Sequence, residues 1–212
     1  MNKEKKLNRK VFHGITAVSL LLFLFVGKPS PLYSRQNRPR ASISLSLGYF
    51  LPKEQAFKEL YGNHKPQLNL NIRYVLKKNV SLYSGLRYLS CKGETKIVGP
   101  EFQEEKYELK FTMYSIPLAL IYSSAYKNVH PFFGGGVSYN IYKEEWEEFG
   151  ISFEGEKLGF FLIGGVEYFI GKRFSFLAGA QYSLISTKQG GKLDENINLG
   201  GIELALGISF HL

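Results

Sequence analysis

Histidine, aspartate and cysteine carry much of enzyme catalysis and metal binding, and this chain holds few of them. Beyond residue 40 the histidines are His64, His130 and His211. Asp194 is the only aspartate and Cys91 the only cysteine, which excludes an aspartate pair, an internal disulfide and a zinc site made from paired cysteines. A serine hydrolase needs Ser, His and a carboxylate within hydrogen-bond reach, and neither an H-x-S nor a G-x-S-x-G motif is present. We therefore expect no enzyme, no bound metal and no cofactor.

The acidic stretch Lys143–Lys157 is a second candidate for chemistry, because it holds six glutamates beside Trp146. Binding of divalent cations by the carboxylates and contact with a partner through the tryptophan are two hypotheses for it. Runs of charge more often form a solvated surface, so we interpret this stretch as a solvated acidic loop.

Composition predicts a folded domain. The chain has 212 residues, of which 44% are hydrophobic and 15% aromatic, with 22 glycines, so a disordered chain is excluded and one domain is expected. The net charge of +9 suggests a nucleic-acid partner, but residues 1–34 alone carry +5 of it. Outside that segment no phosphate-binding loop or nucleic-acid patch is found.

The N-terminal segment is typical of a secretory signal. A basic stretch, Met1–Lys10, precedes the 17-residue apolar run Val11–Gly27, which is shorter than a membrane-spanning helix requires. We interpret residues 1–34 as a signal peptide whose cleavage site is uncertain, and residues 35–40 as a short basic leader. An uncleaved anchor helix is the alternative.

From Ala41 onward apolar residues recur at every second position, as in β-strands. In residues 41–50 Ile43, Leu45 and Leu47 share one face, while serines and a glycine occupy the other. Eight segments follow this pattern, joined alternately by short and long polar links, which predicts an antiparallel up-and-down meander. The predicted strands are 41–50, 67–76, 80–91, 107–122, 131–142, 157–170, 174–185 and 199–212.

The apolar face of this meander is predicted to contact lipid. Gly, Ala and Ser dominate the opposite face, which lacks Lys, whereas a sheet face in water should be rich in long polar side chains. A soluble lipocalin-like barrel, with the apolar face inside, is the alternative. Aromatic residues gather on the apolar face near the strand ends, as at the two interfaces of a bilayer. The expected membrane-interface aromatics are Tyr49, Tyr74, Tyr88, Tyr122, Tyr139, Tyr168, Tyr182 and Phe210.

Because a bilayer leaves no backbone group unpaired, the sheet must close. The predicted fold is all-β: an eight-stranded antiparallel up-and-down transmembrane β-barrel over residues 41–212. Pro117 cannot donate a ladder hydrogen bond, so we expect a bulge there.

Several motifs resemble one family. YSIPLALIY (Tyr114–Tyr122) and HPFFGGGVSY (His130–Tyr139) resemble a strand pair of bacterial outer-membrane β-barrel domain (porin-family) proteins, and Gly165–Leu184 resembles their next hairpin. The end, Gly207–Leu212, resembles the C-terminal signal read by the barrel-assembly machinery, with Leu212 where Phe is commonest. The resemblance implies a small barrel in the outer membrane of a Gram-negative cell. Its expected partners are outer-membrane lipid, lipopolysaccharide and the assembly machinery, and we expect a monomer.

Four charged residues are predicted to lie inside the barrel as a lumen polar network. We expect two ion pairs across the lumen, Arg73–Glu167 and Arg87–Glu203, because unpaired charges in so narrow a space are costly. A gated ion path through the same residues is the alternative. Nearby glycines, such as Gly165 and Gly179, are expected to make room for long side chains or to let the strands curve.

The functional hypothesis is a non-enzymatic outer-membrane barrel that acts through its extracellular loops in binding, adhesion or envelope integrity. A narrow channel for small molecules or ions is one alternative, and a lipid-modifying outer-membrane enzyme is another.

Overall fold

The computed structural model describes residues 40–98, 104–146, 148–188 and 196–212. The expected signal peptide and all of the basic leader except Arg40 lie outside the described residues. Within them, no helix is long and apolar enough to cross a membrane.

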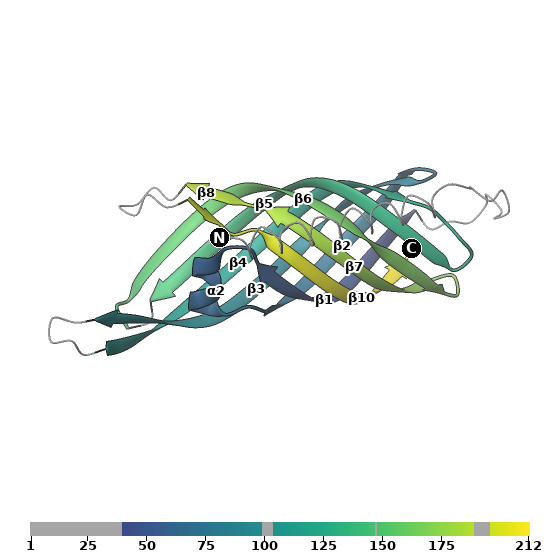
Figure 1. Ribbon diagram of the computed structural model, residues 1–212. Helices are drawn as coiled ribbons and strands as arrows, with labels where there is room; N and C mark the ends of the chain where they lie inside the picture. Colours follow the sequence, from purple (N-terminus) through teal and green to yellow (C-terminus); the bar gives the residue numbers. More distant parts are fainter. Residues whose placement is uncertain (1–39, 99–103, 147, 189–195) are drawn as a thin grey trace, which may run out of the picture. The chain divides into compact units, whose positions relative to one another are not determined.

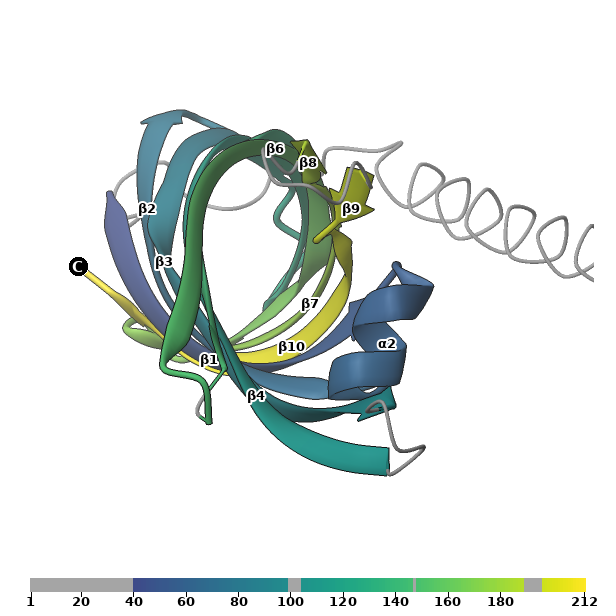
Figure 2. The same ribbon diagram turned by 90° about the vertical axis from the view of Figure 1, so that its left-hand side faces the viewer.

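Eight of the strands close into a barrel in the order β1-β10-β7-β6-β5-β4-β3-β2, and β2 pairs with β1. Each strand is antiparallel to its neighbours along the chain, so the predicted up-and-down meander is confirmed. Figure 2 views the barrel from one end, where the strands form a ring. The barrel strands are β1 (Ala41–Pro52), β2 (Lys65–Lys77), β3 (Val80–Val98), β4 (Glu104–Ser123), β5 (Val129–Trp146), β6 (Ile151–Ile170), β7 (Phe174–Leu184) and β10 (Gly201–His211).

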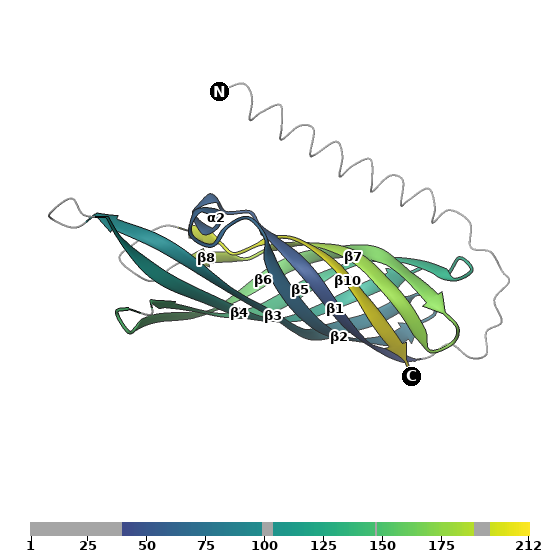
Figure 3. The ribbon, with the colours of Figure 1, turned by 90° about the horizontal axis from the view of Figure 1, so that it is seen from below.

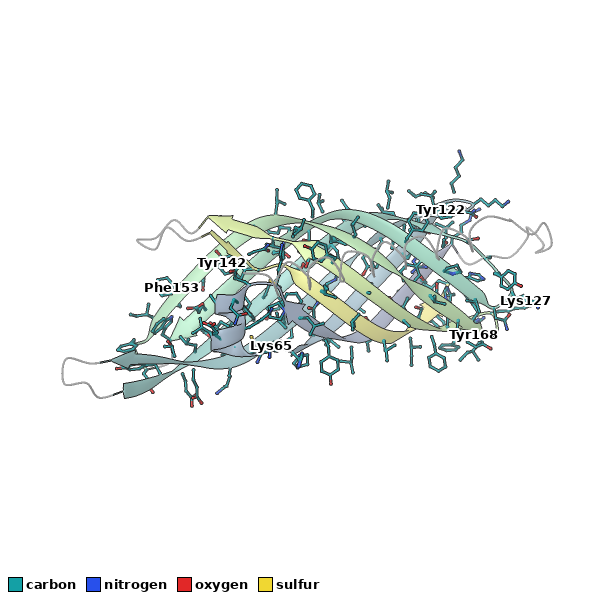
Figure 4. All side chains as sticks on the ribbon, viewed as in Figure 1. Lys65, Tyr122, Lys127, Tyr142, Phe153 and Tyr168 are labelled. Atoms are coloured by element: carbon teal, nitrogen blue, oxygen red, sulfur yellow. The ribbon has the colours of Figure 1, made fainter. Side chains whose placement is uncertain are left out.

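Side chains alternate across the barrel wall in the predicted sense. On β1, Leu47 is 68% exposed on the outer surface, whereas its neighbour Ser46 is 3% exposed inside. The same alternation on the other strands covers the outside with apolar side chains (Figure 4). A barrel with apolar residues outside and small polar residues inside suits hydrocarbon, and it excludes the lipocalin-like alternative.

The links lie at the two ends as expected: the three short ones at the end that holds the C-terminus, and the long ones at the end that holds α2 (Gln55–Tyr61) (Figure 3). Because outer-membrane barrels place short turns in the periplasm, we call these the periplasmic and extracellular ends. The first long link contains α2, which begins at Gln55 and ends at Tyr61. In the last link, β8 (Ser186–Lys188) pairs with β9 (Asn196–Asn198).

Two hairpins are longer than predicted. The β3–β4 ladder extends to the pair Val98↔Glu104, and the β5–β6 ladder reaches Trp146↔Ile151, so most of the expected loop 143–156 is strand. Figure 1 shows the β3–β4 hairpin projecting beyond the other strands. Apolar alternation detects the part of a strand that touches lipid, whereas the β3–β4 ladder continues beyond it with mostly polar residues on both faces.

The bulge expected at Pro117 is wrong. The β3–β4 ladder is interrupted opposite Gly85 and Leu86, but the register is the same on both sides, with Ser84↔Leu118 and Arg87↔Ser115. Proline's fixed φ is compatible with an extended strand, so losing its donor breaks the ladder locally and no residue needs to be inserted. The register shift that the structure does show lies between Val75 and Lys77 on β2.

The lipid-facing surface can be tested by placing charge on it. Leu206, 70% exposed, lies midway along the outer face of β10. Leu206→Arg should lower the free energy of unfolding by about 2–4 kcal/mol, because it puts a charge near the bilayer midplane. Ile202→Arg, on the same face but beside Tyr182, should cost about 0–1 kcal/mol. Urea unfolding from lipid vesicles measures both, and equal losses would contradict the assignment of the outer face to lipid.

Candidate functional site

The lumen holds the predicted pair of Arg73 and Glu167. Arg73 is on β2 and Glu167 on β6, and Arg73 Nη1 lies 2.9 Å from Glu167 Oε2, so this ion pair is confirmed. The guanidinium also lies over the ring of Phe132, 5.1 Å from its centroid. A Cβ on Gly165 would approach Phe132 Cζ to 2.7 Å. The glycine at 165 therefore makes room for the ring that supports the arginine.

Glu167 has two further partners that the sequence analysis missed. Its Oε1 accepts a hydrogen bond from Ser175 Oγ at 2.6 Å, and His211 Nε2 lies 3.2 Å from the same oxygen. Ser175 Oγ and His211 Nε2 are 2.8 Å apart. The sequence of β10 could have indicated that His211 lies near these residues. Side chains alternate along the strand, so His211 must face the lumen because its neighbour Phe210 faces outward.

These three residues have the side chains of a serine-hydrolase triad without its arrangement. In a triad the histidine joins serine and carboxylate through its two ring nitrogens. Here Ser175 and Glu167 both contact the same nitrogen, Nε2 of His211. Ser175 is also 1% exposed, which leaves a substrate no access to its hydroxyl. The arrangement fixes β10 to β6 and β7 and cannot generate a nucleophile.

The predicted Arg87–Glu203 pair is wrong: among the described residues, neither of the two forms a salt bridge. Arg87 is 4% exposed and faces the lumen, where its Nη2 donates to Tyr83 Oη at 3.2 Å and its guanidinium lies over Phe161. Glu203 accepts hydrogen bonds from Gln67 Nε2 at 3.1 Å and Asn69 Nδ2 at 2.5 Å.

The register explains why the second pair does not form. Asn69 is the β2 partner of Arg87, so its amide stands between the arginine and β1. Glu203 lies against β1, where its Oε1 is only 2.6 Å from the position that a Cβ on Gly48 would take. From there its carboxylate reaches the side-chain amides of β2 before it could reach Arg87. Each buried charge thus has polar or aromatic partners of its own.

Other polar side chains fill the lumen between these charges. Ser115 Oγ donates to Asn140 Oδ1 at 2.6 Å, and Asn140 Nδ2 donates to Ser138. Below them an apolar cluster includes Ile121 and Phe161. Eight strands leave an interior that side chains can largely fill, and these two groups of residues occupy its middle.

At the extracellular end, α2 packs on the inner face of the barrel wall. Phe57 and Tyr61 of the helix pack on Phe111 of β4, with ring centroids 5.1 Å and 5.6 Å away. A Cβ on Gly93 of β3 would come within 2.2 Å of the backbone oxygen of Leu60, so glycine there lets the helix approach the wall. Cys91 is buried in the same cluster, and burial raises the pKa of its thiol to about 11.

The acidic segment forms the end of the β5–β6 hairpin. Lys143 Nζ lies 2.8 Å from Glu145 and 3.4 Å from Glu154, and the carboxylates raise the pKa of Lys143. Trp146 Nε1 donates to Glu144 Oε1 at 2.9 Å. Across the described ranges, no group of three or more His, Cys, Asp and Glu side chains is placed to hold a metal ion.

The eight predicted interface aromatics all lie on the outer face of their strands. Tyr122 and Tyr168 lie near the periplasmic end, where Lys127 marks a turn, and Phe153 lies at the opposite end (Figure 4). Tyr122 packs on Phe133, and Phe210 packs on Phe174. Their action as interface anchors stays a prediction.

Removing the Glu167 charge should destabilise the barrel more than removing that of Glu203. Glu167→Gln leaves Arg73 without its anion in the lumen, where breaking a buried ion pair costs about 3–5 kcal/mol. Glu203→Gln, the matched control, keeps partners that are neutral amides, so we expect a loss nearer to 1 kcal/mol. Urea unfolding in lipid vesicles compares them. A loss from Glu203→Gln as large as that from Glu167→Gln would contradict this account of the lumen.

Cys91 should be protected from alkylation in the folded barrel. Because burial raises the pKa of its thiol to about 11, the group is neutral at pH 8.5, and it is also covered by α2. We expect Phe57→Ala to raise the rate of maleimide labelling at least about tenfold by opening the helix–barrel contact. Phe160→Ala, on the outer surface, should leave that rate unchanged. Fast labelling of the unmutated folded protein would contradict closure by α2.

Comparison with known proteins agrees with the fold. The structure resembles that of Neisserial surface protein A, with a TM-score of 0.58 and 16% identity over 84% of this chain and all of that chain. It also resembles OprG from Pseudomonas aeruginosa (TM-score 0.55, 11% identity, 84% of this chain and 99% of that chain). A third similar structure is Ail, the attachment invasion locus protein of Yersinia pestis, in complex with the heparin analogue sucrose octasulfate (TM-score 0.51, 16% identity, 83% of this chain and all of that chain).

At these identities the likeness concerns the fold alone, and no curated protein matches the chain in sequence. A family model, however, matches residues 17–210, which is most of the chain. Together with the closed barrel and its apolar outer surface, this match shows that the chain belongs to the outer membrane protein β-barrel domain family and is a bacterial outer-membrane protein.

Proposed function

We propose that this protein is a non-catalytic outer-membrane barrel that binds partners through its extracellular hairpins, in adhesion or in maintaining the envelope. The observation that carries the proposal is the packing of side chains inside the barrel. Phe57 and Tyr61 of α2 pack on the inner face of the wall at the extracellular end, and the Arg73–Glu167 layer crosses the lumen near the periplasmic end. With both levels occupied by packed side chains, the surface left for function is the one that faces outward.

The extended hairpins supply that surface. Phe149, Ile151 and Phe153 are each about half exposed at the end of the β5–β6 hairpin, beyond the band that faces lipid. The Phe149 ring lies 4.8 Å from that of Tyr107 and 6.2 Å from that of Trp146, so these side chains form an aromatic group that joins two hairpins. Apolar side chains that gather on a surface in water favour contact with a partner.

The names of similar structures are consistent with contact between the extracellular hairpins and a partner. Neisserial surface protein A is by its name a surface protein, and Ail is an attachment invasion protein whose structure holds a heparin analogue. The described part of the β5–β6 hairpin carries more glutamate than lysine, so for this chain a protein surface suits the hairpin better than a sulfated glycan.

Shortening the β5–β6 hairpin should abolish adhesion and leave the barrel intact. In the test variant an Asn-Gly turn joins Glu144 directly to Phe153, which removes the hairpin end that carries Phe149. The matched control replaces Lys127-Asn128 by Asn-Gly in a periplasmic turn. Expressed in a Gram-negative host, both variants should reach the outer membrane and show heat-modifiable gel mobility. We expect the shortened variant to lose adherence to epithelial cells while the control retains it. If cells with the unmutated protein adhere no better than cells with empty vector, the adhesion proposal fails.

Conductance distinguishes this function from a channel. Planar-bilayer recording of the refolded protein should show no reproducible discrete current, because the Arg73–Glu167 layer and the packed side chains above it cross the lumen. Steady unit conductance would favour the channel, and a change in lipid A mass after incubation with lipopolysaccharide would favour an enzyme.

A further inference from the structure

The periplasmic end of the barrel contains a pocket that the proposed function does not use. Its volume is about 100 Å³, and it opens inside the ring of short turns, with lining residues from seven barrel strands and from the β2–β3 turn. Arg73, Lys78, His130, Glu167 and His211 supply its charged and titratable side chains. We call this pocket the vestibule.

The vestibule has an excess of positive charge with unused capacity to donate. Glu167 is its one acidic lining residue, and both carboxylate oxygens already accept hydrogen bonds from the protein, Oε1 from Ser175 and Oε2 from Arg73. Arg73 donates to Glu167 through Nη1, and its side chain is 14% exposed. The vestibule therefore has more cationic side chains than its one carboxylate can neutralise.

The walls hold two imidazoles in fixed positions. The Phe169 ring lies between them, 4.3 Å from the ring of His130 and 4.5 Å from the ring of His211. His130 also contacts the backbone oxygen of Lys127. Because both rings are held, either can present a charged N–H toward an anion when it is protonated.

The turns around the opening carry charge of the same sign. The three short links contain no Asp or Glu. Their basic residues are Lys78, Lys127, Lys172 and Arg173, and Lys77 at the end of β2 precedes the first link. The described glutamates other than Glu167 lie toward the extracellular end. A ring of one sign around a low-dielectric cleft focuses its field and concentrates counter-ions at the opening.

We propose that the vestibule binds a small oxyanion, the phosphate or carboxylate group of a soluble periplasmic molecule. Its lining residues face the lumen, so a water-soluble group reaches it more directly than a lipid headgroup in the surrounding leaflet. The volume of about 100 Å³ holds one such group but not a large ligand. Arg73, Lys78 and the two imidazoles supply the donors, and Glu167 holds Arg73 in place.

Calorimetric titration of the full barrel with inorganic phosphate, in maltoside micelles that carry no phosphate of their own, tests the proposal. We expect saturable binding. Lys78→Gln should weaken it about tenfold, as loss of a charged donor does. The matched control, Lys172→Gln, removes the same charge from a turn that does not line the vestibule, and should change the affinity by less than about twofold because exposed charge is screened. Both lysines are in exposed turns, so neither variant should impair folding.

Three results would overturn the proposal. The first is the absence of saturable phosphate binding, and the second is equal weakening by the two lysine variants, which would indicate diffuse surface charge. The third is phosphate binding in phosphatidylcholine nanodiscs that is lost in phosphatidylglycerol nanodiscs, which would identify a lipid headgroup as the occupant.

Discussion

The pairing of every backbone amide and carbonyl inside hydrocarbon is the constraint on which the rest of this structure depends. Lipid offers no hydrogen bonds, so a sheet that crosses the membrane must have no edge. The chain meets this requirement by pairing β1 with β10, its first barrel strand with its last. Closure also sets the face that each side chain takes, because alternate residues then touch either lipid or the lumen.

Closure with eight strands makes the lumen narrow, and this narrowness governs what the interior can contain. Gly and Ser allow the walls to approach, and the few charged side chains must find partners at short range. Arg73 has a carboxylate, Arg87 has a hydroxyl and an aromatic face, and Glu203 has two amides. At the extracellular end, the aromatic rings of α2 pack on apolar side chains of the inner wall, such as Phe111.

The two ends of the barrel differ in chemistry because their links differ in length. Short turns at the periplasmic end leave little beyond the lipid except basic residues around the vestibule. Long hairpins at the other end carry ladders into water, and with them Trp146, Phe149 and Phe153. The two ends thus differ in surface: an extended aromatic and acidic surface at the extracellular end, and a small basic pocket at the periplasmic end.

The sequence by itself determined the strands, their outward faces and the closed barrel, because lipid imposes a period of two that is visible in the apolar residues of 41–50 and its counterparts. It also determined that Arg73 and Glu167 share a depth and therefore meet. Only the tertiary structure decided that Glu203 turns to Gln67 and Asn69 rather than to Arg87, because that choice depends on register and on distances of a few ångströms between strands remote in sequence. For the same reason only the fold joined His211 to Glu167 and Ser175. The extension of the hairpins beyond the membrane was also visible only in the tertiary structure. Where both faces of a strand contact water, the apolar alternation by which a strand is recognised is weakened.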